Sequence, residues 1–265
     1  MKKTAQKKNN LKDITFCIPV RVESEYRKRN LFTLLEYLNK DIETNFIILE
    51  ADEEKKINLP TKFSEIDYVF VQDYDSIFHR TKYINQMLNR SKTPYVAIWD
   101  TDAIAPIEQI IKAYHSLLHK GTTLVYPFSG TFYEIDEELS DLFCINPDIQ
   151  ILHNPFMPKS LLNGYYSVGG AYMINKEKYQ KAGGENQNFY GWGPEDSERI
   201  ARMQILEEKT ERIDGPLYHL FHTRGHNSSY ANIDTSINTK HEFCKICEMM
   251  PSELKEYIKT WEWTH

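Results

Sequence analysis

The stretch YVAIWDTD, residues 95–102, joins five apolar residues directly to an Asp-x-Asp pair. A short apolar run bounded by polar residues predicts a buried strand. Side chains alternate along an extended segment, so the carboxylates of Asp100 and Asp102 should point to the same side. Two adjacent anions at the end of a buried strand are costly unless a cation joins them. The stretch therefore predicts a strand whose end carries either a divalent-cation site or an acidic turn before a helix.

Similar apolar runs alternate with helical patterns along the first half of the chain. Short buried strands that alternate with amphipathic helices predict an α/β fold with a mostly parallel central sheet flanked by helices. Ligands of such sheets bind beyond the carboxyl ends of the strands, so Arg21, Asp52 and the two aspartates should border one crevice. We expect strands at residues 14–20, 46–49, 68–71, 95–99 and 123–126, and helices at 24–39, 80–90 and 106–119.

The second half of the chain shows weaker periodicity. We expect an irregular segment at 131–167, a strand at 170–174, a mobile loop at 186–193, a helix at 194–207, a strand at 217–222 and a helical end from 238. The chain is thereby divided into a disordered basic tail at 1–12, one α/β domain at 13–230 and a helical C-terminal extension at 231–265.

The composition excludes several classes of function. The chain has 265 residues, and 32 Lys and Arg against 38 Asp and Glu give a net charge of −6, which argues against a nucleic-acid partner. No apolar run approaches the roughly 20 residues that span a membrane. The basic N-terminus lacks the apolar stretch of a secretory signal. We therefore expect a cytoplasmic protein whose N-terminal lysines make weak peripheral contact with an anionic membrane face.

Missing glycine motifs exclude two further classes. The turn after the first predicted strand contains no glycine, whereas a dinucleotide pyrophosphate requires close backbone approach there. No phosphate-cradling loop of the Gly-x-x-x-x-Gly-Lys type exists either. Cys17 is expected in the core, and Cys244 and Cys247 are expected on a C-terminal helix, because a structural zinc site would need a second ligand pair.

A second polar cluster lies in the stretch GWGPED, residues 191–196. Trp192 offers a flat face on which a sugar ring can stack, and Gly193 adds a flexible backbone. Glu195 and Asp196 fall in the first turn of the predicted helix, where the helix dipole stabilises anions. Each carboxylate therefore either stabilises the helix start or acts as a general base toward a hydroxyl group.

Two histidines follow near the C-terminal side of the predicted domain. His219 and His222 would face opposite sides of a regular strand, unless the chain bends between them. Each is either a metal ligand or a structural side chain. A metal held by Asp102 needs further ligands, and these imidazoles are the candidates.

Arginines supply the candidate anion-binding groups. Arg21 follows the first strand directly and Arg80 begins a helix. Either can hold a phosphate or a base edge through its planar guanidinium. Arg27 and Arg29 are expected on an exposed helix face.

In chain order, these motifs resemble the GT-A glycosyltransferases, and most of all the β-1,4-galactosyltransferase family and its bacterial relatives. Pro194 stands where the family has a glycine, Ser197 where it has an acid, and His219 where it has a metal-binding methionine. The likeness spans about residues 14–226. The matching pieces are IPVR (18–21), FHRTK (78–82), DTD (100–102), Gly169-Gly170, GWGPED (191–196) and HTR (222–224).

The resemblance implies inverting transfer of a sugar from a UDP-sugar, of galactose or N-acetylgalactosamine type, to a saccharide or lipid-linked saccharide hydroxyl. It implies Mn²⁺ or another divalent cation as cofactor. The implied catalytic residues are Asp196 and Glu195, and the implied metal ligands are Asp102, His219 and His222. The implied donor-binding residues are Pro19, Arg21, Asp52, Phe78, Arg80, Asp100, Asp102 and Gly170, and the implied acceptor-binding residues are Trp192, Gly193, Glu195 and Asp196.

Two other functions compete with this interpretation. A phosphatase with a nucleophilic Asp-x-Asp is disfavoured, because that class carries the motif at its N-terminal strand and a Thr or Val where this chain has Ile104. A nucleotide-sugar-binding scaffold without turnover is disfavoured because Asp102, Asp196 and His222 are all intact.

Overall fold

A seven-stranded, mostly parallel sheet forms the centre of the computed structural model, which describes residues 7–157, 159–162 and 164–264. The strand order is β10-β6-β9-β4-β1-β2-β3, and β9 alone runs antiparallel to its two neighbours. The predicted α/β sheet is therefore confirmed. The strands are β1 (Asn9–Val20), β2 (Ile42–Asp52), β3 (Asp67–Gln72), β4 (Tyr95–Trp99), β6 (Leu124–Tyr126), β9 (Ala171–Asn175) and β10 (Thr210–Arg212).

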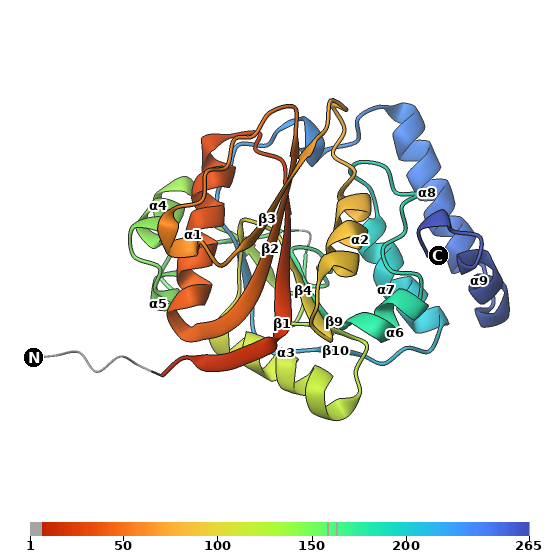
Figure 1. Cartoon of the computed structure of the whole chain (residues 1–265), viewed down its shortest axis with the longest axis horizontal. Helices are drawn as coiled ribbons and strands as arrows, with labels where there is room; N and C mark the ends of the chain where they lie inside the picture. The colour runs from red at the N-terminus through yellow and green to blue at the C-terminus, as the bar shows by residue number, and fades with distance from the viewer. Residues whose placement is uncertain (1–6, 158, 163, 265) are drawn as a thin grey trace, which may run out of the picture.

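Helices cover both sides of this sheet, as Figure 1 shows with α1, α4 and α5 to the left and α2, α6 and α7 to the right. The hydroxyl of Ser24 caps α1 by accepting from the Arg27 amide. The helices are α1 (Glu25–Asp41), α2 (Arg80–Arg90), α3 (Ile107–Lys120), α4 (Glu137–Ile145), α5 (Ile149–His153), α6 (Lys176–Lys181), α7 (Glu195–Ile205), α8 (Ile233–Cys247) and α9 (Pro251–Ile258), with short 3₁₀ turns at Thr61–Phe63, His226–Ser228 and Glu262–Thr264.

A second, four-stranded sheet lies beside the end of β4. It contains β5 (Ala103–Ile104), β7 (Phe132–Glu134), β8 (Ser160–Leu161) and β11 (Leu217–His219), in the order β5-β11-β7-β8. β11 pairs antiparallel with β5, so that His219 lies opposite Ala103. This small sheet therefore carries the C-terminal part of the chain to the segment that follows the Asp-x-Asp pair.

Three sequence predictions about local structure are wrong. Residues 9–12 belong to β1 and not to a disordered tail, because Asn9 and Asn10 pair with the start of β2 and Leu11 is buried; residues 1–6 lie outside the described residues. The segment 131–167 is not irregular throughout: Asp136 and Asp148 cap α4 and α5. The strand predicted at 217–222 ends at His219, because its partner β5 begins at Ala103; the Leu220 amide still donates to the Asp102 carbonyl in the same register.

The helical C-terminal end packs against α7. α8 begins at Ile233, earlier than predicted, and Cys244 and Cys247 lie exposed on it, as expected. Ile246, Leu254, Ile258 and Trp261 form a small apolar cluster of their own. No helix in the described part of the chain is both long and apolar enough to cross a bilayer.

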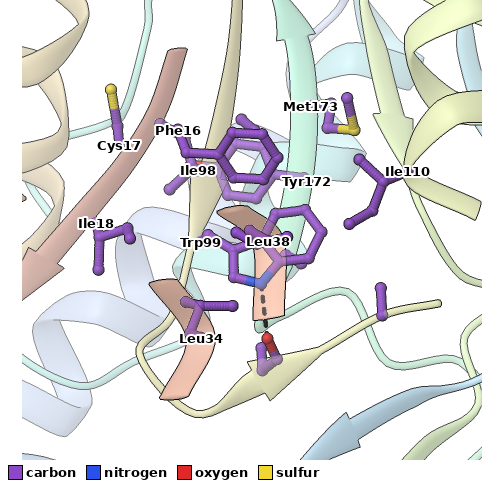
Figure 2. Packing of buried hydrophobic residues seen from close by; sticks show 14 of the residues in the cluster. Phe16, Cys17, Ile18, Leu34, Leu38, Ile98, Trp99, Ile110, Tyr172 and Met173 are labelled. Carbon is purple, nitrogen blue, oxygen red and sulfur yellow. Dashed lines mark hydrogen bonds between the residues drawn. The ribbon is translucent and has the colours of Figure 1, made fainter. Parts of the chain in front are cut away.

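The main core lies directly behind the Asp-x-Asp pair. Trp99 is fully buried, and Figure 2 shows it among Phe16, Leu38 and Tyr172. Its ring lies 5.3 Å from that of Phe16, and its Nε1 donates to the Ala103 carbonyl at 2.7 Å. This hydrogen bond closes the turn that presents Asp100 and Asp102 at the edge of the sheet.

We expect Trp99→Phe to lower the free energy of unfolding by about 1–3 kcal/mol, because it leaves the Ala103 carbonyl without this donor and removes buried volume. Urea unfolding followed by circular dichroism measures the change. Trp192→Phe is the control, since the Trp192 side chain is 46% exposed. Equal stability of the two variants would contradict the structural role of Trp99.

Candidate active site

A cleft of about 580 Å³ opens where β1 and β4 end. Its walls come from both sheets and from the loops before α2 and α7. The predicted site residues that line it are Pro19, Arg21, Phe78, Arg80, Asp100, Asp102, Trp192, Glu195, Asp196, His219 and His222. Most of the polar side chains that were singled out separately in the sequence thus face one cavity.

Asp102, His219 and His222 form one group that could hold a metal ion, with a ligand atom from each within 4.8 Å of the others. His222 Nε2 lies 3.3 Å from Asp102 Oδ2, and His219 Nε2 lies 3.7 Å from Asp102 Oδ1. The chain does bend between the two histidines, because β11 ends at His219. One carboxylate and two imidazoles suit manganese, iron or zinc.

The protonation states of Asp102 and His222 suit ligation. Burial lowers the pKa of His222, and this favours the neutral imidazole that binds a metal. Burial opposes ionisation of Asp102, but His219, His222 and Arg27 together hold its pKa below the usual range. The carboxylate is therefore ionised at neutral pH.

Asp100 has a different partner from Asp102. Arg80 Nη2 donates to Asp100 Oδ1 at 2.7 Å, and Arg80 Nη1 lies 4.0 Å from Asp196 Oδ1. The metal-binding group does not include Asp100. The two carboxylates of the Asp-x-Asp pair therefore serve two neighbouring centres, one built around imidazoles and one around a guanidinium.

Asp196 is held by a buried chain of charges. Arg199 Nη1 donates to Asp196 Oδ1 at 2.7 Å. The same guanidinium, fully buried and stacked over the Tyr172 ring at 3.9 Å, donates to both carboxylate oxygens of Glu185. Gly169 makes room for this arrangement, since a Cβ there would lie 2.6 Å from Asp196 Oδ2. The position of the Asp196 carboxylate is thus fixed by the interior of the protein.

Glu195, the neighbour of Asp196, is a buried carboxyl group at the cleft. Burial, with the neighbouring Asp196 charge, raises the pKa of Glu195 to about 8. Its Oε2 accepts a hydrogen bond from the Gly193 amide at 3.1 Å. At neutral pH Glu195 is mostly protonated and can donate a hydrogen bond in the cleft.

Comparisons with known proteins bear on the family and the fold of this chain. Residues 153–227 match a family model described as the N-terminal domain of galactosyltransferase. A search of curated proteins finds no match. A Drosophila β1,4-galactosyltransferase 7 mutant in complex with manganese, UDP-Gal and xylobiose superposes with a TM-score of 0.53 at 14% identity, covering 85% of this chain and 78% of that one.

Two other solved structures give similar values. Glucosyl-3-phosphoglycerate synthase from Mycobacterium tuberculosis, with Mn²⁺, UDP and phosphoglyceric acid, has a TM-score of 0.51 at 13% identity over 89% of this chain and 78% of that one. Mannosyltransferase PcManGT from Pyrobaculum calidifontis, with GDP-Man and Mn²⁺, has a TM-score of 0.54 at 12% identity, and the match covers 93% of this chain and 68% of that one. This chain has the GT-A fold. It spans 64% of the Drosophila catalytic domain in a xylobiose complex.

The resemblance to GT-A glycosyltransferases is therefore confirmed. The family-model match covers the C-terminal part of the likeness, which contains Trp192, Asp196, His219 and His222. The motifs before residue 153 lie outside that match. For them the support is the GT-A fold and the shared cleft.

Four predicted site residues have mainly internal contacts in this GT-A fold. Arg21 lines the cleft, but its donors bond the Ala51 and Asp75 carbonyls and the Asp73 carboxylate. The other three do not line the cleft. Asp52 accepts from the Val22 amide and pairs with Lys56 at 2.9 Å, the Gly170 carbonyl accepts from the Asp100 amide, and Gly193 packs against Thr239.

Arg27 is the residue that sequence reasoning misplaced. Its side chain is only 22% exposed, lines the cleft, and brings Nη1 to 3.6 Å from Asp102 Oδ2. Arg27 lies in the first turn of α1, where its amide donates to the Ser24 cap, and its side chain faces the cleft. Arg29, two residues later, is partly exposed and pairs with Asp141 of α4.

We expect Glu185→Gln to destabilise the protein at pH 7 by about 3–5 kcal/mol, because Arg199 then lacks its buried counter-charge. Burial opposes the charge of Glu185, yet Arg199, Tyr172 and Tyr179 lower its pKa from 4.5 to about 2. A carboxyl group whose pKa is depressed by folding stabilises the folded state at pH values above its unfolded pKa. This stabilisation is lost as the group becomes protonated. The difference between wild type and variant should therefore shrink as the pH falls from 4.5 toward 2.

Chemical denaturation at several pH values measures this difference. Glu177→Gln is the matched control, because its partner Lys181 is exposed and the pair lies on the surface; its stability should equal that of the wild type. A pH-independent difference for Glu185→Gln would show that the lost stability does not come from the ionised carboxylate.

Proposed function

We propose that this protein is a metal-dependent inverting glycosyltransferase that moves a sugar from a UDP-sugar, of galactose or N-acetylgalactosamine type, to a hydroxyl of a saccharide or lipid-linked saccharide. One observation carries the proposal: the group of Asp102, His219 and His222 shares a cleft with Asp196. A metal centre and an anionic carboxylate in one cavity are the two elements that such a transfer needs.

Donor binding is assigned to the wall formed by the first strand and α2. Phe78 offers an aromatic face at the cleft, and Arg21 lies 5.5 Å from the centre of its ring. Because the nitrogens of Arg21 are bonded internally, its role is to hold Phe78 and the ends of β2 and β3 in place. Pro19 lines the same part of the cleft.

The metal ligands fit a divalent cation such as Mn²⁺, which the proteins in the three superposed structures also bind. Asp102, His219 and His222 would hold it. When bound, such a cation stabilises the negative charge that develops on the departing diphosphate. Arg80 Nη1 is buried and has no hydrogen-bond partner among the described residues, so it can donate to an anion in the cleft.

Asp196 is the proposed general base. Its Oδ1 is occupied by Arg199, and the carboxylate is 30% exposed toward the cleft. In the transfer, the acceptor oxygen attacks the anomeric carbon as the bond from that carbon to the diphosphate oxygen breaks, and the acceptor proton passes to Asp196. A single displacement inverts the configuration at the anomeric carbon.

Trp192 and Glu195 are assigned to the acceptor side. The Trp192 ring contacts Tyr230 edge to face at 4.7 Å and remains 46% exposed beside the cleft. An aromatic face at this place can stack on a sugar ring and shield the reacting atoms from water. The protonated Glu195 carboxyl can donate to an acceptor hydroxyl.

A phosphatase of the Asp-x-Asp type fits this arrangement less well. Such chemistry needs one aspartate free to attack phosphorus. Here Asp100 is engaged by Arg80 and Asp102 by the imidazoles and Arg27. Incubation with Mn²⁺, a panel of UDP-sugars and saccharide acceptors, and in parallel with a phosphate monoester, separates the candidates. A transferase produces a glycoside from the first mixture, a scaffold only binds the UDP-sugar, and a phosphatase releases phosphate from the monoester.

We expect Asp196→Asn to reduce transfer by about 10²–10⁴-fold, the usual contribution of a general base, while UDP binding stays near the wild-type value. Product formation and calorimetric titration with UDP measure the two effects. Asp214→Asn is the control, because Asp214 is exposed and does not line the cleft. Transfer that survives the substitution with little loss would remove Asp196 from this role.

We expect Asp102→Ala to abolish the dependence of UDP binding on the metal, because the substitution removes the oxygen ligand of the centre. Titration with UDP in the presence and absence of Mn²⁺ measures this dependence. In the wild type, Mn²⁺ should strengthen UDP binding. If the variant responds to Mn²⁺ as the wild type does, the metal is held elsewhere.

A further inference from the structure

The guanidinium of Arg27 places a fixed positive charge beside the proposed metal centre. Its Nη1 lies 3.6 Å from Asp102 Oδ2, the oxygen that His222 Nε2 approaches to 3.3 Å. The nearest carboxylate to its Nε is that of Glu23, at 3.7 Å. Asp102 therefore faces a guanidinium and two imidazoles at once.

The Nε group of Arg27 is buried and has no hydrogen-bond partner among the described residues. A buried donor without an acceptor is unfavourable, and a donor on a charged group more so. The guanidinium lines the cleft, where a phosphate could accept from it. Planar guanidinium groups match phosphate oxygens in paired hydrogen bonds.

We propose that Arg27 couples the metal to the nucleotide: it opposes binding of a divalent cation alone and favours binding of the cation together with a diphosphate. This inference rests on the proposed function and deepens it. A cation bound at Asp102 and the guanidinium of Arg27 would both lie next to the same carboxylate, and like charges at this separation repel. A diphosphate brings negative charge and acceptors that attract both cations.

Such an arrangement produces a coupling free energy between the binding of the two ligands. If the diphosphate raises the affinity for the metal, the metal raises the affinity for the diphosphate by the same factor. Arg27 supplies part of that factor, because it is unfavourable to one ligand and favourable to the other. The metal then occupies its ligands mainly when donor is present.

The test is a set of calorimetric titrations of the protein with Mn²⁺ alone, and with UDP at saturating Mn²⁺. Arg27→Met keeps the length of the side chain and removes its charge. We expect this variant to bind Mn²⁺ alone about three- to tenfold more tightly than the wild type, and UDP with Mn²⁺ about tenfold more weakly, within the usual range of coupling between sites. The release of free Mn²⁺ can be followed independently by electron paramagnetic resonance.

Two further variants make the result specific. Arg29→Met is the matched control, because Arg29 lies on the same helix, pairs with Asp141 and does not line the cleft; both affinities should stay at the wild-type values. Arg27→Lys keeps the charge without the planar fork, so Mn²⁺ alone should bind as weakly as to the wild type while UDP loses part of its affinity.

The outcomes separate this inference from the function on which it rests. A wild type that binds neither Mn²⁺ nor UDP overturns both. If the wild type binds both ligands and Arg27→Met behaves like Arg29→Met, the proposed function stands and the role of Arg27 is wrong. Weaker binding of Mn²⁺ alone to Arg27→Met would also overturn it, because Arg27 would then support the metal centre.

Discussion

The antiparallel pairing of β11 with β5 is the constraint on which the candidate active site depends. It places His219 opposite Ala103, and the hydrogen bond from the Leu220 amide to the Asp102 carbonyl continues this register up to the Asp-x-Asp pair. The chain then turns, so that His222 reaches the same carboxylate. Residues far apart in the sequence thus become one group of ligand atoms through backbone hydrogen bonds.

Charge neutralisation organises the rest of the cleft. Carboxylates and guanidinium groups alternate from Asp100 through Arg80, Asp196 and Arg199 to Glu185. Buried charges are tolerated when each has a partner and hydrogen bonds. The alternation holds Asp196 in place before any substrate binds, which is the preorganisation that catalytic groups require. It also separates the chemistry of Asp100 from that of Asp102.

Local patterns predicted most of the central sheet. The strand at 95–99 and the helix at 80–90 coincide with β4 and α2, because apolar periodicity reports which side chains are buried. Predictions were wrong where long-range contacts decide the outcome. Residues 9–12 are polar except for Leu11, but they extend β1 because the start of β2 is available for pairing. The short helices after residue 136 are a different case, since their caps, Asp136 and Asp148, are local.

The sequence by itself determined the α/β architecture, the placement of the Asp-x-Asp pair at a strand end, and the residue types from which a metal centre and a base could be built. Only the tertiary structure decided which charges meet. In the folded protein Asp100 pairs with Arg80, and Arg27 faces Asp102. Asp52 lies outside the cleft, and burial raises the pKa of Glu195. The physical reason is that burial follows from local periodicity, whereas electrostatic interaction depends on distances in space.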